Sequence, residues 1–191
     1  MFRRRRPNDD EIRAFIADQA PRPFSYADVG ATRGAPPAAY TCDHNRVVLG
    51  NGRALFERAV AALQRWEMFA LRGVELCWPT APIAVGTTVA ILAGDRGLWS
   101  LNACRIVYLL DETGPLIRKG FAYGTLPEHG VRGEERFLIE WDQATDQVSY
   151  DLLAISQPSS LLIALARPLL RRVQKRFARQ SLAAMRRAAS G

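Results

Sequence analysis

The order in which the hydrophobic periods follow one another is what most constrains the fold of this chain. Apolar residues alternate with period two, which is typical of strands, over most of residues 75–156. The period becomes 3.6, which is typical of a helix, over residues 159–189. A short strand and one helix come before the alternating region. This order predicts an α+β fold, in which a curved antiparallel sheet grips its own C-terminal helix. A functional site would then lie in a cavity between the two.

Short stretches of turn-forming residues divide the alternating region into strands. Glycine and aspartate recur in these stretches, and strands joined by such short turns pair antiparallel. We predict a first short strand at residues 46–49, with Asp43 as a turn former before it. Further strands are predicted at residues 74–78, 87–92, 99–110, 116–123, 136–141 and 147–155, which gives a sheet of six to seven strands.

Two helices with apolar stripes flank these strands. Residues 53–69 predict a helix whose stripe is expected to plug one end of the cavity, formed by Phe56, Ala59, Val60, Leu63 and Trp66. The C-terminal helix is expected to lay a second stripe across the concave side of the sheet, formed by Leu162, Leu165, Leu169, Val173 and Phe177. Pro168 either starts a helical segment or kinks a continuous helix.

The first forty residues do not follow either period. Asn8, followed by three acidic residues, predicts the start of a short helix that ends before Pro21. Four prolines in residues 21–40 predict an ordered loop or an arm that crosses the body, and the sequence leaves open whether this arm closes the cavity. We therefore expect an N-terminal helical extension, residues 1–20, and one domain, residues 21–191.

The positive charge of the chain is concentrated at its ends. The formal net charge is +7, but residues 3–6 are all arginine, and eight basic residues follow Asp151 without any acidic one. The C-terminal helix is therefore strongly basic, and three interpretations apply to it. A solvated outer face is the commonest, and a weak contact with an anionic membrane surface is the second. Nucleic acid is the third, and we expect no nucleic-acid binding because the helix has few aromatic residues.

No motif for a metal or another cofactor is found. Gly50-Asn51-Gly52 precedes a helix but lacks the further residues of a phosphate loop. The three cysteines and two histidines have no zinc-ligand spacing, and an odd cysteine count argues against a disulfide framework. No apolar run reaches the ~18 residues of a membrane span. We predict a reduced, cytoplasmic protein without a cofactor. The sequence does not indicate its oligomeric state.

Seven stretches of the chain resemble one protein family. They are FSYADVGATRG (24–34), DHNRVVLG (43–50), RWEMFAL (65–71), ELCWP (75–79), LWSLNACRIVY (98–108), GFAYGTLPEHGVRGEERF (120–137) and SYDLLAISQP (149–158). Together they are similar to the domain of unknown function 1990 family of bacteria and plants, with the order of elements of the START-like and Bet v 1-like helix-grip fold. The resemblance implies this helix-grip architecture and carries over no catalytic residue.

Arg105 is the first candidate for a role in a site. Alternation places Trp99 and Arg105 on one face of their strand, among apolar neighbours. A guanidinium in such surroundings needs a partner, because an unpaired buried charge is costly. Arg105 is therefore either in a structural ion pair with Glu134, Glu135 or Glu140, or an anchor for an anionic ligand head group. The ion pair is the commoner arrangement.

His129, Glu134 and Glu135 are close in sequence and suggest acid–base chemistry. A histidine beside a carboxylate can act as a general base, although a solvated loop histidine is the more ordinary interpretation of His129. On a strand, Glu134 and Glu135 point to opposite faces and cannot form a carboxylate pair, unless the loop before the strand extends through them.

By analogy with helix-grip relatives, we expect a non-enzymatic carrier or sensor of a small hydrophobic or amphipathic ligand. The residues expected to orient or contact the ligand are Arg105, Tyr123, Glu135, Trp99 and Phe121. One alternative is a cavity enzyme of the polyketide-cyclase or hydratase type, using His129 and Glu134. The other is a peripheral interaction module that acts through the basic C-terminal helix.

Overall fold

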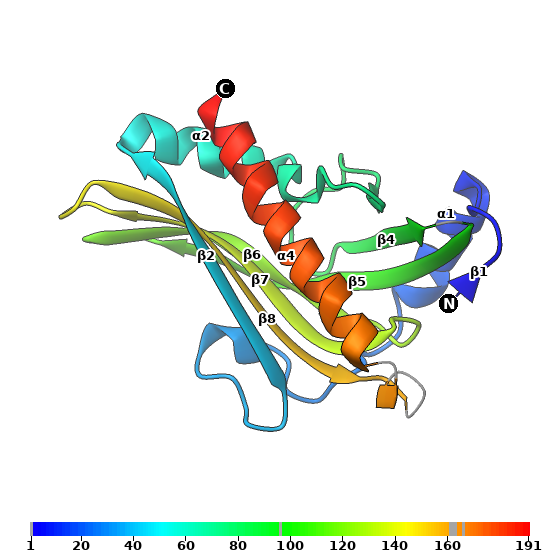
Figure 1. Ribbon diagram of the computed structural model, residues 1–191. Helices are drawn as coiled ribbons and strands as arrows, with labels where there is room; N and C mark the ends of the chain where they lie inside the picture. Colours follow the sequence, from blue (N-terminus) through cyan, green and yellow to red (C-terminus); the bar gives the residue numbers. More distant parts are fainter. Residues whose placement is uncertain (1, 96, 161–163, 166) are drawn as a thin grey trace.

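One antiparallel sheet forms the body of the molecule and curls around the long C-terminal helix (Figure 1). The computed structural model describes residues 2–95, 97–160, 164–165 and 167–191. The sheet order is β2-β8-β7-β6-β5-β4-β3, and the short strand β1 pairs with β5 outside this order. The strands are β1 (Phe2–Arg3), β2 (Thr41–Asn51), β3 (Val74–Cys77), β4 (Thr88–Asp95), β5 (Leu98–Glu112), β6 (Leu116–Thr125), β7 (Val131–Asp142) and β8 (Gln147–Pro158).

The alternating pattern located β2 to β8 but not β1, and the largest differences are at β2 and β7, which begin well before their predicted starts. β2 pairs with β8 from Thr41↔Ser156 to Asn51↔Gln147, instead of covering residues 46–49 only. Its first half carries polar residues such as Asp43 on one face, so the apolar alternation that marks a strand begins late. β7 likewise begins at Val131, before the predicted start at residue 136.

The helix α2 (Arg53–Gln64) packs against one end of the sheet. It ends before the predicted residue 69, because Trp66 adopts a left-handed conformation with φ 59° that an α-helix does not allow. A 3₁₀ turn, η2 (Glu67–Phe69), follows. Phe56 and Trp66 are buried, so the prediction of an apolar plug at this end is confirmed.

The helix α4 (Arg167–Ser190) lies across the concave side, but not with the predicted face. Leu165, Leu169 and Val173 are 81%, 64% and 53% exposed, whereas Leu162 lies outside the described residues. The buried residues of α4 are mostly small: Ala178, Ser181, Ala184, Met185 and Ala189. The predicted contact stripe is therefore wrong before Phe177, which does pack against the core. Small side chains let the helix approach the sheet closely, and this decides which face is buried. Pro168 lies in the first turn of α4, where a proline is tolerated.

The N-terminal segment covers the outer, convex side of the sheet. The helix α1 (Asp9–Gln19) has a capping box between Asn8 and Glu11, and it buries Ile12 against β4 and β5. The arm that follows contains the 3₁₀ turn η1 (Ala31–Arg33), which packs on β7 and β8. The arm thus packs on the outside of the sheet. None of the described helices is long and apolar enough to cross a membrane.

Candidate functional site

The concave face of the sheet is lined by alternate residues of its central strands. Strand register places Tyr123 of β6 opposite Glu135 of β7, and Phe121 opposite Phe137. These side chains turn toward α2, η2 and α4, and most are fully buried in the main core. The candidate site is therefore built on β6 and β7, whose backbone pairing fixes the spacing of its side chains.

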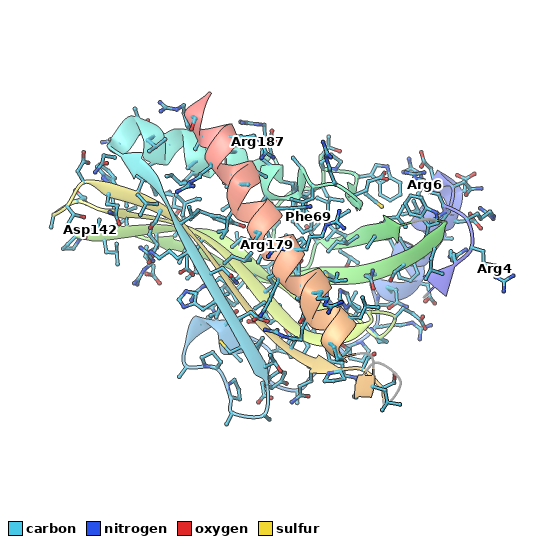
Figure 2. The ribbon with its side chains drawn as sticks, viewed as in Figure 1. Arg4, Arg6, Phe69, Asp142, Arg179 and Arg187 are labelled. Carbon is cyan, nitrogen blue, oxygen red and sulfur yellow. The ribbon has the colours of Figure 1, made fainter. Side chains whose placement is uncertain are left out.

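Phe69 packs between the sheet and the middle of α4. Its ring centroid lies 5.6 Å from that of Phe177 on α4, 5.9 Å from Phe137 and 6.3 Å from Tyr123. Figure 2 shows Phe69 beside the middle of α4. The aromatic cluster packs one side of the concave face with apolar atoms, and the sequence places Phe69 only at the end of a predicted helix.

Glu135 supplies a carboxyl group to the concave face of the sheet. Tyr123 donates a hydrogen bond from its hydroxyl to Oε2 of Glu135 at 2.6 Å. Burial raises the pKa of Glu135 to about 7, with the hydrogen bond from Tyr123 opposing this shift and the negative charge of Asp43 adding to it. The Glu135 side chain is half-buried, and Oε1 has no hydrogen-bond partner among the described residues. Near neutral pH this carboxyl can accept a hydrogen bond when ionised and donate one when protonated.

An ion pair fixes α4 beside Glu135. Tyr123, Glu135, Ala154 and Asp43 follow one another in register across four strands. Asp43 accepts two hydrogen bonds from Arg171 of α4, one of them at 2.5 Å, and Gln174 donates to Ser156 Oγ at 3.1 Å. These contacts hold the first half of α4 over the polar end of the concave face. The prediction that Asp43 is a turn former is wrong, because this residue lies within β2.

Arg105 and Trp99 lie on the opposite face. Their predicted common face is confirmed, but it is the convex one, where Trp99 packs beside the Ile12 cluster of α1. Arg105 donates to the carbonyl oxygens of Ala20 and Arg22 at 2.8 Å each, and its guanidinium stacks 4.4 Å from the ring of Phe24. Arg105 therefore lies outside the concave face, and its hydrogen bonds go to backbone carbonyls instead of a glutamate. Through these bonds it holds the arm, because backbone carbonyl oxygens can accept the hydrogen bonds that a guanidinium donates.

His129 and Glu134 are not brought together in an acid–base pair. Nδ1 of His129 accepts from the backbone N–H of Val131 at 3.1 Å, and burial lowers the pKa of His129 to about 4. Glu134 faces the convex side, opposite to Glu135 as the alternation predicts. It accepts hydrogen bonds from the arm: from Tyr26 Oη and Gly30 N at 2.7 Å, from Thr32 N at 3.0 Å, and from Thr32 Oγ1.

Two open surface pockets lie near the C-terminal half of α4. One, of about 640 Å³, is lined by Gly50 and Arg187 among others, and the other, of about 210 Å³, by Leu71 and Gln180 among others. Neither is lined by Tyr123 or Glu135, and no group of three metal-ligating side chains was found among the described residues.

Comparison with known proteins decides the family. The family model described as "Domain of unknown function (DUF1990)" matches residues 25–184. The chain belongs to the DUF1990 family. The family match includes both the concave face and the arm that covers the convex face.

Two relatives of this DUF1990 chain agree with the assignment. A UPF0548 protein of Dictyostelium discoideum is 38% identical, over 93% of this chain and 90% of its own length. A UPF0548 protein of Deinococcus radiodurans is 39% identical, over 99% of each chain. The chain also resembles the crystal structure of TTHA0849 from Thermus thermophilus, with a TM-score of 0.51 and 14% identity over 78% of this chain and 97% of that chain. The fold is the START-like and Bet v 1-like helix-grip fold, as predicted.

Proposed function

We propose that this protein binds a small amphipathic molecule between the concave face of the sheet and the first half of α4. The observation that carries the proposal is the Glu135 carboxyl, which lies half-buried in an apolar surface and uses only Oε2 in a hydrogen bond to a described residue. Oε1 is not among the buried side-chain atoms that lack a hydrogen-bond partner, so it is open to a molecule from outside. A ligand that donates to Oε1 adds a hydrogen bond to a charged group, which is worth about 1.5–3 kcal/mol.

The surroundings of Glu135 define the ligand class. The rings of Phe69, Phe137, Tyr123 and Phe121 are buried on this face, and their apolar atoms favour a ligand with an apolar body. The carboxyl favours a head group with a hydroxyl or an amine, since both donate hydrogen bonds to it. Arg105 and Trp99 are left out of this proposal because they face the arm and α1 on the convex side.

The test is native mass spectrometry of the protein purified from its own host, followed by organic extraction of whatever is bound. We expect one apolar molecule with a hydroxyl or amine group. The extracted molecule is then titrated against Glu135→Gln and, as a matched control, Glu57→Gln on the exposed face of α2. Binding at least about ten-fold weaker in Glu135→Gln alone supports the site, since one charged hydrogen bond is worth about 1.5–3 kcal/mol. A mass equal to that of the bare chain contradicts the carrier function, and equal binding by both variants contradicts the site.

A second function, proton transfer by a cavity enzyme, is favoured by one observation. A general acid or base works best when its pKa lies near the working pH, and the pKa of Glu135 is about 7. Glu135 with Tyr123 would then replace His129 with Glu134 as the acid–base pair. Incubation of the extracted molecule with the protein in D₂O separates the two functions. Deuterium incorporated at carbon by the wild type, but not by Glu135→Gln, indicates the enzyme; no incorporation by either indicates the carrier.

A further inference from the structure

The first half of α4 carries a row of apolar side chains that the fold leaves in solvent. Leu169 and Val173 lie four residues apart, which aligns them along one flank of the helix. We call these two residues the α4 stripe, and they are 64% and 53% exposed. Leu165, which precedes the first residue of α4, is 81% exposed. The ion pair of Arg171 with Asp43 and the hydrogen bond of Gln174 to Ser156 keep a different face of the helix against the sheet.

Basic side chains border the α4 stripe without acidic partners. Arg172 and Arg176 are exposed and lie one row beside it at the same four-residue step, and Lys175 and Arg179 extend the positive surface. None of these four forms an ion pair with a described residue. The chain has no acidic residue beyond Asp151, so no neighbour along the helix balances the charge. Figure 2 shows Arg179 on the middle of α4.

We propose that the α4 stripe and its bordering arginines bind the surface of an anionic phospholipid bilayer. A helix that lies in such a surface inserts its apolar flank ~5–10 Å below the head groups, while its cations pair with anionic lipid. Charge complementarity favours an anionic bilayer over an apolar protein surface as the partner. On an apolar protein surface, the four basic side chains that form no ion pair with a described residue would lose water without gaining a counter-charge. Nucleic acid fits less well, since aliphatic side chains offer no ring for base stacking. The docking surface does not depend on the proposed ligand site.

The test is co-sedimentation of the full chain with phosphatidylcholine vesicles that either contain or lack phosphatidylserine. We expect binding only to the vesicles with phosphatidylserine, and its loss at high salt because screening weakens the attraction. Leu169→Ser with Val173→Ser should weaken the partition at least about ten-fold, given about 1.5–3 kcal/mol per buried aliphatic side chain. Arg172→Glu with Arg176→Glu should weaken it at least about ten-fold as well, given about 1 kcal/mol per basic residue.

Two control variants lie away from α4. Val29→Ser changes a side chain of the arm that is 45% exposed, and Arg4→Glu changes an exposed arginine at the N-terminal end. Both should bind vesicles within about two-fold of the wild type, as substitutions on an unrelated surface do. All stripe residues are exposed, so the urea midpoint should stay unchanged and confirm that each variant is folded.

Three results would overturn the proposal. The first is no sedimentation of the wild type with phosphatidylserine vesicles. The second is sedimentation that the stripe variants do not weaken. The third is a dimer in light scattering that Leu169→Ser with Val173→Ser dissociates, because the α4 stripe would then bind a second copy of this chain.

Discussion

The hydroxyl of Tyr123 and the carboxyl of Glu135 lie 2.6 Å apart, directly across the pairing of β6 with β7. This polar pair lies beside the aromatic rings of the concave core. The pair stands close to the Asp43–Arg171 contact that fixes α4, and the charge of Asp43 contributes to the raised pKa of Glu135, so the two contacts are coupled electrostatically.

The first prediction concerns the pH dependence of stability. Burial raises the pKa of Glu135 to about 7 from 4.5, so between these values the folded state holds a proton that the unfolded state has released. The free energy of unfolding contributed by Glu135 is therefore full below pH 4.5 and is lost as the pH rises through about 7. Glu135→Gln does not titrate and should lack this loss, which we expect to be about 1–3 kcal/mol.

Urea unfolding at pH 4.5 and at pH 8 checks this prediction. The difference in stability between Glu135→Gln and the wild type should shift in favour of the variant at the higher pH. A difference that is the same at both values would mean that Glu135 titrates normally in the folded protein.

The second prediction concerns the arm. Arg105→Ala removes two hydrogen bonds to the carbonyls of Ala20 and Arg22 and the stacking on Phe24, so we expect a loss of about 2–3 kcal/mol of stability. Hydrogen exchange should become faster at Ser25, whose amide bonds to Thr125 of β6, while ligand binding stays unaffected. Weakened ligand binding with an unchanged arm would instead return Arg105 to the binding site.

The third prediction concerns the attachment of α4. Arg171→Ala removes the contact with Asp43 and should cost about 1 kcal/mol, because the pair is partly exposed. Its neighbour Arg172 has no ion pair with a described residue, so Arg172→Ala is a matched control with an expected change of about 0.5 kcal/mol or less. Faster amide exchange at residues 169–176 in the first variant only would confirm the tether, and equal rates in both would contradict it.

The fourth prediction concerns the aromatic core. Phe69 is 6% exposed and contacts rings from β6, β7 and α4, so Phe69→Ala should cost about 3–5 kcal/mol through the cavity it leaves. Phe69→Leu refills part of that cavity and should cost less. Urea unfolding of both variants measures the difference, and similar small losses would mean that Phe69 is not part of the packed core.

The sequence was enough to predict the local elements and the fold class. Period-two alternation located the six strands from β3 to β8, because a strand's faces are set by its own residues. It also predicted that Glu134 and Glu135 face opposite sides and that Trp99 shares a face with Arg105. Of the five proposed ligand contacts, Phe121, Tyr123 and Glu135 lie on the concave face.

Which face of the sheet becomes the concave one was decided only by tertiary structure. Arg105 is a polar residue among apolar ones, whether its face of β5 is the concave or the convex one. Only the docking of the arm supplies the carbonyl oxygens that accept hydrogen bonds from its guanidinium. The rotation of α4 is likewise decided by tertiary contacts: its small residues pack against the core, and Arg171 pairs with Asp43, 128 residues away. The sequence determined the apolar row of Leu169 and Val173, since a four-residue step on one helix follows from helix geometry. Contacts between distant residues decided that this row faces solvent, because periodicity fixes which side chains share a face but not what packs against that face.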